Sequence, residues 1–164
     1  MQVLSEDLAM LRAFEAQITV AESELGRLVP LSPFRTLPTV PGWGAIRVGK
    51  YAAAVGDPTR WPGPKQLYRA AGLNPIQYES AGKRRDNVIS REGSVELRRA
   101  LIDMAYGLWL QDPSSKAYAR GLKARGKPGG IIACALANRA NRIAFALVRD
   151  QVDYNPANWP SEED

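Results

Sequence analysis

The chain has 164 residues, of which 45% are hydrophobic, and this suits one compact domain with enough apolar side chains for a core. It contains no histidine and a single cysteine, Cys134, so an internal disulfide, a structural zinc site, a Ser-His-Asp triad and a Cys-His dyad are all excluded within it. The formal net charge is +5, and no unbroken apolar run is long enough to cross a bilayer, so we expect a soluble, cytoplasmic protein in which any metal would depend on carboxylates.

Residues 3–29 are predicted to form one helix. Apolar residues recur there every seven positions and at intermediate offsets, which is typical of a coiled coil. Such a narrow stripe needs a partner, either a second copy of the chain or later helices of the same one. We favour self-association and treat residues 1–30 as a coiled-coil-like unit. The seven-residue repeat consists of Leu4, Leu11, Ile18 and Leu25.

Residues 31–151 are expected to form the main domain, which the pattern predicts to be mainly helical with one small β-hairpin. Pro and Gly residues punctuate a connector at 30–45, and further breakers separate the elements that follow. The acidic tail, residues 152–164, is expected to be loose. The expected elements are helices near 45–55, 64–71, 95–111, 114–124 and 131–148, and strands at 76–80 and 87–90 joined by a turn over 81–86.

The positive charge is concentrated in the middle of the chain. Residues 83–127 hold eleven bases and five acids, whereas the last fifteen residues hold five acids and no base. A basic centre of this kind suits a phosphate backbone. The alternative is a basic face that only contacts water, and charge alone does not decide between them.

The stretch Leu37–Gly44 resembles the hairpin of a helix-hairpin-helix DNA-binding motif. Gly42 and Gly44 would let the backbone approach a ligand closely, and the first amides of the next helix could hold a phosphate. Arg47 and Lys50 would add positive charge in the first two turns of that helix. The alternative is an ordinary Pro-Gly loop, so the motif by itself is weak evidence.

A second motif runs from Tyr78 to Arg85. Here Ser80 lies at the end of a predicted strand, next to three consecutive bases that could neutralise a phosphate under attack by the serine hydroxyl. Because the chain has no histidine, the base that activates Ser80 would be a carboxylate, a bound metal or a group from another domain or chain. On these residues alone, a hairpin turn with solvated bases is the favoured interpretation. The three bases are Lys83, Arg84 and Arg85.

Taken together and in order, the motifs resemble the C-terminal domain of the insertion-sequence one-ten family of transposases, which also includes the pilin-gene invertase. The resemblance covers about residues 35–150. It implies a catalytic serine in this domain, a preceding coiled coil and, before that, an RNase-H-like domain whose carboxylates bind magnesium; several members are guided by a structured RNA. The matching strings are Leu37–Gly44, Val55–Pro58, Leu67–Pro75, Glu79–Arg85 and Ile89–Leu101.

Carried over residue by residue, the resemblance makes Ser80 the nucleophile that forms a phosphoserine link to DNA. Gly82 matches the glycine of the serine signature, and Gly93 and Arg98 match a glycine and an arginine at the start of the next helix. Gly126-Lys127 matches a Gly-Lys before the last helix, although Pro128-Gly129-Gly130 replaces the usual charged residues. We expect the Ser80 hydroxyl to be exposed on the hairpin, near Arg84 or Arg85 or the start of the helix that follows Gly93, where unpaired amides suit a phosphate. The expected nucleic-acid contacts are Gly42, Gly44, Lys83, Arg84, Arg85, Arg91, Arg98 and Lys127.

The RNase-H-like domain has no counterpart in this sequence, so the resemblance implies an excised domain or a truncated gene product. No cofactor is expected in this chain, and magnesium would belong to the other domain. The expected partners are DNA, a guide RNA in some members, and a second copy of the chain. Two alternatives remain open: a non-catalytic nucleic-acid-binding module, and an architectural dimerisation domain built on residues 3–29.

Overall fold

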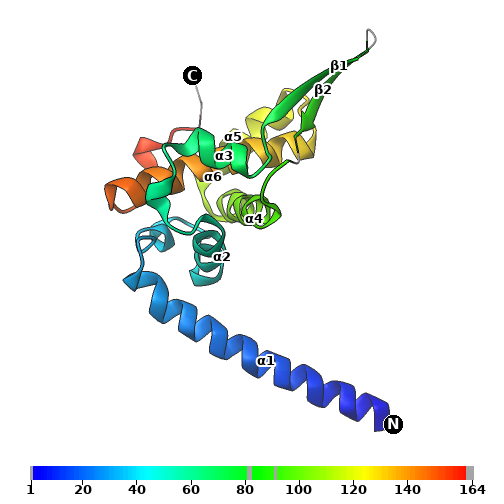
Figure 1. Ribbon diagram of the computed structural model, residues 1–164, viewed down its shortest axis with the longest axis vertical. Coiled ribbons are helices and arrows are strands. Elements are labelled where there is room, and N and C mark those ends of the chain that lie inside the picture. The colour runs from blue at the N-terminus through cyan, green and yellow to red at the C-terminus, as the bar shows by residue number, and fades with distance from the viewer. Residues whose placement is uncertain (1, 81–82, 91, 162–164) are drawn as a thin grey trace.

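A computed structural model describes residues 2–80, 83–90 and 92–161, with the backbone alone described for 2–3 and 75–88 (Figure 1). The fold is mainly helical, as predicted. Four short 3-10 turns accompany the longer elements: η1 (Val29–Leu31), η2 (Leu37–Thr39), η3 (Pro58–Arg60) and η4 (Pro156–Asn158). The main elements are α1 (Gln2–Leu28), α2 (Ala45–Val55), α3 (Pro64–Ala70), β1 (Pro75–Ser80), β2 (Lys83–Ile89), α4 (Val95–Gln111), α5 (Pro113–Ala124) and α6 (Gly129–Asp150).

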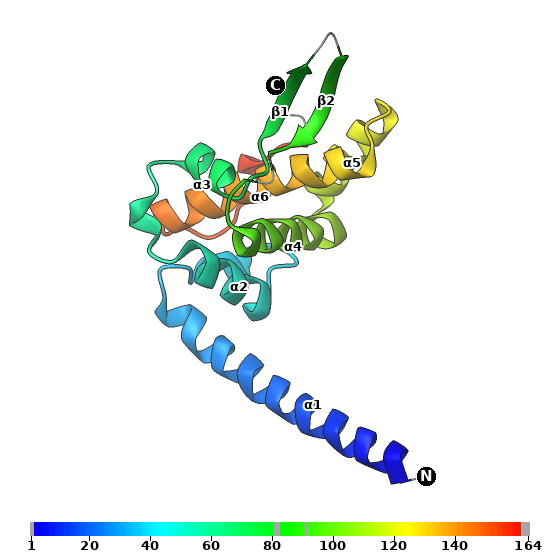
Figure 2. The same cartoon turned by 45° about the vertical axis from the view of Figure 1, so that its right-hand side comes forward.

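The first helix, α1, projects away from the rest of the molecule (Figures 1 and 2). The predicted helix over 3–29 is confirmed to within one residue at each end. Near its C-terminal end, the Leu25 side chain packs over Gly49 of α2, where an added Cβ would lie 2.7 Å from a leucine methyl carbon. Most of α1 therefore does not pack on later helices of the same chain, because its other large apolar side chains in the described range 4–28 are exposed.

The core forms where α4 crosses α6, with α2 packed against another face of α4. The apolar face predicted for the helix after Gly93 is buried, because its residues recur at helical spacing and face both neighbours. Trp43, just before α2, is also buried, and its indole Nε1–H donates to the carbonyl of Met104 at 2.9 Å. The buried face of α4 comprises Leu97, Ala100, Leu101, Met104, Ala105, Gly107 and Leu108.

By length and composition, α6 is the one helix in the described part of the chain that could cross a membrane. Half of the most apolar stretch of α6 is buried inside the molecule. It also carries Arg139, whose side chain is buried and hydrogen-bonded. These features are those of the core helix of a globular domain.

The two strands pair antiparallel and extend away from the helices (Figure 1). Ser80 pairs with Lys83, so β2 begins at Lys83 and not at Asn87 as the sequence pattern suggested. The prediction of a basic turn over 81–86 was therefore wrong in extent. The two strands stay paired as far as Ser80 and Lys83, so the three bases, Lys83, Arg84 and Arg85, lie in β2.

The tail is held against the body at least as far as Pro160, contrary to the expectation of a loose segment over 152–164. The guanidinium of Arg139 donates to the carbonyls of Trp159 at 2.6 Å and Pro160 at 2.8 Å. The Tyr154 hydroxyl donates to Asp112 at 3.2 Å, and burial together with this carboxylate raises the pKa of Tyr154 to about 12. Most of the acceptors in this attachment are backbone carbonyls, which every residue has. The pattern of side chains in the sequence therefore does not predict it.

Candidate nucleic-acid interface

Gly42, the first glycine of the helix-hairpin-helix-like loop, is explained by packing against α4. Its φ of +82° is one that side chains rarely adopt, and an added Cβ would overlap the carbonyl oxygen of Gly107. Gly107 meets the same constraint from the other side, because a Cβ there would lie 2.6 Å from the carbonyl oxygen of Gly42. The pair lets the loop and α4 touch backbone to backbone, so the absence of a side chain at Gly42 needs no nucleic acid to explain it.

Gly44 differs from Gly42 because a Cβ added there would meet nothing within 4 Å. It is the N-cap of α2 and borders a hollow of about 440 Å³ that also touches Pro41 and Gln111. Its expected contact with a phosphate remains a prediction.

The bases in the first turns of α2 are paired with α4. Arg47 Nε lies 3.1 Å from Asp103 Oδ1, and Lys50 Nζ lies 3.4 Å from Asp103 Oδ2. Arg47 also donates to the carbonyl of Gly42 at 2.9 Å. These side chains therefore help to hold α2 and the loop against α4, and Asp103 offsets part of the positive charge predicted for this face.

At the base of the hairpin, the family-matched residues Gly93 and Arg98 make tertiary contacts. An added Cβ at Gly93 would overlap the carbonyl oxygen of Ala70 at the end of α3, and its φ is +137°. Arg98 Nε donates to the carbonyl of Ala71 at 2.8 Å. Both residues thus join α4 to the end of α3, and a phosphate contact by Arg98 stays a prediction.

The start of α4 is capped by its own side chains. The Ser94 hydroxyl accepts from the amide of Leu97 at 3.1 Å. A backbone hydrogen bond and the Ser94 hydroxyl lower the pKa of Glu96 and keep its carboxylate charged. This negative group occupies the first turn of α4, where the helix start was expected to suit a phosphate.

Ser80 is the last residue of β1, at the far end of the hairpin. The start of α4 lies at the opposite end, near the hairpin's base, so of the expected neighbours of Ser80 the helix start and Arg98 are remote (Figure 1). Two extended strands separate them from Ser80, and a strand rises about 3.3 Å per residue. Arg84, another expected neighbour, pairs with Glu79, the residue before Ser80. Of Ser80, Lys83, Arg84 and Arg85 only the backbone is described, and Arg91 lies outside the described residues.

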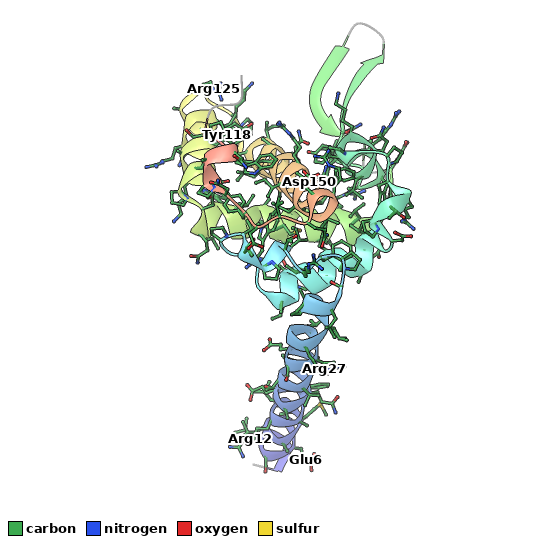
Figure 3. All side chains as sticks on the ribbon, turned by 90° about the vertical axis from the view of Figure 1, so that its left-hand side faces the viewer. Glu6, Arg12, Arg27, Tyr118, Arg125 and Asp150 are labelled. Carbon is green, nitrogen blue, oxygen red and sulfur yellow. The ribbon has the colours of Figure 1, made fainter. Side chains whose placement is uncertain are left out.

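Lys127 belongs to a larger group of cations that the sequence motifs did not single out. From Pro113 to Arg149 there are eight bases and no Asp or Glu. Five of these bases are exposed on or just after α5, and we call them the α5 basic edge; Figure 3 labels Arg125 among them. Counting acid-free stretches would have found this edge. It comprises Lys116, Arg120, Lys123, Arg125 and Lys127.

Within the described part of the chain, no three His, Cys, Asp or Glu side chains are grouped closely enough to hold a metal ion. The described residues therefore offer a backbone hairpin, a basic helix edge and polar surfaces, and no metal centre among them. Such an arrangement can bind phosphates.

The region that contains this hairpin matches a known protein family. Residues 34–120 match the family model described as the transposase IS116/IS110/IS902 family. The chain belongs to this family. The matched region of the transposase domain contains Gly42, Ser80 and Arg98, and ends before Lys127.

Curated relatives agree with this assignment. The chain is 33% identical over 143 residues to the insertion element IS110 uncharacterized 43.6 kDa protein of Streptomyces coelicolor, covering 87% of this chain and 34% of that protein. It is 30% identical over 160 residues to a probable family 20 transposase of Pseudomonas aeruginosa, covering 94% and 47%. It is 32% identical over 136 residues to the transposase for insertion sequence element IS1328 of Yersinia enterocolitica, covering 80% and 40%. The chain thus spans between a third and a half of these relatives.

Proposed function

We propose that this chain acts in the cytoplasm in DNA transposition or site-specific recombination, supplying a serine nucleophile and contacts to the DNA backbone. The observation that carries the proposal is the family match over 34–120, which contains the hairpin with Ser80 and the adjacent bases. The stretch from Pro113 to Arg149, which includes α5 and contains bases but no acid, supports it, because a phosphate backbone attracts positive charge that acids do not offset.

In the proposed reaction, the hydroxyl oxygen of Ser80 forms a bond to a DNA phosphorus while the bond from that phosphorus to one sugar oxygen breaks. The product is a phosphoserine link and a free sugar hydroxyl. Lys83, Arg84 and Arg85 would stabilise the charge that develops on the phosphate oxygens. The proton from Ser80 passes to a base, a role that the family resemblance assigns to a magnesium-binding RNase-H-like domain, and the departing sugar oxygen takes up a proton from that base or from water to become the free hydroxyl.

The shape of the molecule supports a composite site. A helix of 27 residues such as α1 is about 40 Å long, and its N-terminus lies at the opposite end of the molecule from the hairpin (Figures 1 and 2). A domain joined to that end of α1 would be remote from Ser80 of the same chain. The second half of the site would therefore come from another protomer.

We further propose that α1 pairs with α1 of a second copy, because Leu4, Leu11 and Ile18 of its apolar seam are exposed. Leu11→Glu with Ile18→Glu should weaken dimerisation at least about a hundredfold, since burying two charges in a coiled-coil seam is costly. Sedimentation over a concentration series would measure this. The melting temperature of the rest of the chain should stay unchanged, because Leu11 and Ile18 do not pack on it.

A matched control places the same two charges off the seam, as Ala9→Glu with Ala16→Glu, and should leave the dimer intact. A wild-type chain that stays monomeric at high concentration would contradict the pairing of α1.

The leading alternative is a non-catalytic nucleic-acid-binding module, in which Ser80 is only a hairpin residue. Replacing Ser80 with alanine separates the two: the enzyme loses its chemistry and keeps its binding, whereas the module loses nothing. A guide RNA would be an additional partner in either case.

The second alternative is a purely architectural domain, which predicts no salt-dependent affinity for DNA. For the proposed function, the affinity for a random-sequence DNA duplex should fall about a hundredfold between 50 and 200 mM NaCl if roughly four phosphates are contacted. Fluorescence anisotropy measures this directly. Affinity that is absent at low salt, or that does not change with salt, would refute the assignment of the bases.

A further inference from the structure

A polar cleft of about 410 Å³ lies between α3 and α6, at the base of the hairpin. Every side chain in its lining can form hydrogen bonds, two are cations, and none is a carboxylate. The two stretches that form its walls, residues 58–78 and 113–149, contain no Asp or Glu. The lining consists of Lys65, Gln66, Tyr68, Arg69, Asn74 and Asn138.

The walls of the cleft are fixed to each other. The Tyr68 hydroxyl donates to the carbonyl of Cys134 at 2.9 Å, and Asn141 Nδ2 donates to the carbonyl of Pro64 at 2.7 Å. These two bonds join α3 to α6, so the cleft keeps its shape without a ligand. A preformed site loses little conformational entropy when it binds.

Lys65 and Arg69 lie one helical turn apart on α3, and both are exposed. Across the described part of the chain, no ion pair or hydrogen bond of either side chain is found. This contrasts with Arg47 and Lys50, which are paired with Asp103. The two cations of the cleft are therefore available to form ion pairs with a ligand.

The cleft lies next to the other basic parts of the molecule, so that one nucleic-acid strand could contact several of them. Asn74 leads directly into β1, and the turn from α5 into α6 lies on the same side of the molecule as the hairpin, opposite α1 (Figures 1, 2 and 3). A strand that left the cleft could follow the α5 basic edge or the hairpin. The Gly44 hollow belongs to a different part of the surface, between α2 and α4.

We propose that the cleft between α3 and α6 binds one nucleotide of a nucleic-acid strand. Lys65 and Arg69 hold its phosphate, because cations in a cleft that no carboxylate lines attract the backbone. The amide groups of Gln66, Asn74 and Asn138 meet the edge of its base, where amides donate and accept together. This inference rests on the proposed nucleic-acid function and identifies which face carries the strand.

The first test removes the two cations as Lys65→Gln with Arg69→Gln. Affinity for nucleic acid should fall at least about tenfold at 100 mM NaCl, and the slope of log affinity against log salt should shrink by roughly 1.4 to 1.8 for two lost contacts. Fluorescence anisotropy with a 30-base-pair DNA duplex, a 30-nucleotide DNA strand and an RNA stem-loop identifies the preferred strand. The loss must appear with the probe that the wild-type chain binds most tightly.

The matched control is Arg12→Gln with Arg35→Gln, which removes the same charge from exposed sites on α1 and the η1–η2 connector. It should change the affinity less than about twofold, because these sites lie away from the cleft. Thermal melting should show that both double variants are folded.

The second test maps the strand directly with a photo-crosslinking residue at Gln66 or at Gln111. We expect cross-links from Gln66, in the cleft, and few from Gln111, in the hollow beside Gly44. Cross-linking from Gln111 alone, or equal affinity of the cleft and control variants, would overturn the cleft assignment and leave the proposed function intact. A wild-type chain that binds none of the three probes would contradict both the cleft assignment and the proposed function.

Discussion

Ser80→Ala is expected to reduce covalent protein–DNA adducts at least about a thousandfold, since nothing else replaces a lost nucleophile. DNA affinity should stay within about twofold, because the hydroxyl adds no charge for the backbone. The measurement is denaturing-gel trapping of adducts in an assembly that also contains the RNase-H-like domain and magnesium. This chain alone should give no adduct, because it has no histidine to accept the proton.

The matched control is Ser90→Ala, at the other end of the hairpin, where the Ser90 amide bonds to the carbonyl of Asn74 at 3.0 Å. The backbone bond survives this change, so adduct formation should be normal. Peptide mapping of the trapped adduct decides the assignment. A modified residue other than Ser80 would end the enzymatic interpretation of this domain and leave its DNA binding untouched.

Gly42→Ala is expected to lower the free energy of unfolding by about 3 kcal/mol, combining left-handed strain with overpacking. Its φ is +82°, and the new methyl group would overlap the Gly107 carbonyl, so α4 and the loop would have to separate. Urea unfolding followed by circular dichroism measures the change.

Gly44→Ala is the matched control, because Gly44 has φ −73° and open space around it. It should cost less than about 1 kcal/mol, the difference between glycine and alanine at an N-cap. If both variants were equally stable, the close approach of Gly42 and Gly107 would not exist in solution. If Gly44→Ala weakened nucleic-acid binding, the loop would regain its predicted ligand role.

Helices were the most predictable part of this protein, because their signals are local. The seven-residue repeat located α1, Gly44 and Gly56 bounded α2, and Ser94 marked the start of α4. Each of these signals acts within a few residues of the boundary that it sets. The long apolar run likewise located α6, although its first and last turns extend beyond the prediction.

Contacts between distant segments were not predictable in the same way. Gly42 and Gly107 are both ordinary glycines in the sequence, and only the fold brings their backbones together. Arg98 was assigned to a phosphate from the family resemblance, but its Nε reaches the carbonyl of Ala71, an acceptor that every residue type carries. The cleft at Lys65 and Arg69 was missed for a similar reason, because it matches no motif and exists only where α3 meets α6.

The attachment of Arg139 to the tail has a consequence for how the domain is made. A nascent chain emerges from the ribosome N-terminus first, so α6 emerges before Trp159 and Pro160 do. Until these two residues emerge, water solvates the guanidinium in place of their carbonyls, which later accept from it at 2.6 Å and 2.8 Å. The surface of α6 around Arg139 can therefore close only after residue 160 has emerged, and a chain cut short before that residue would expose this surface to proteases.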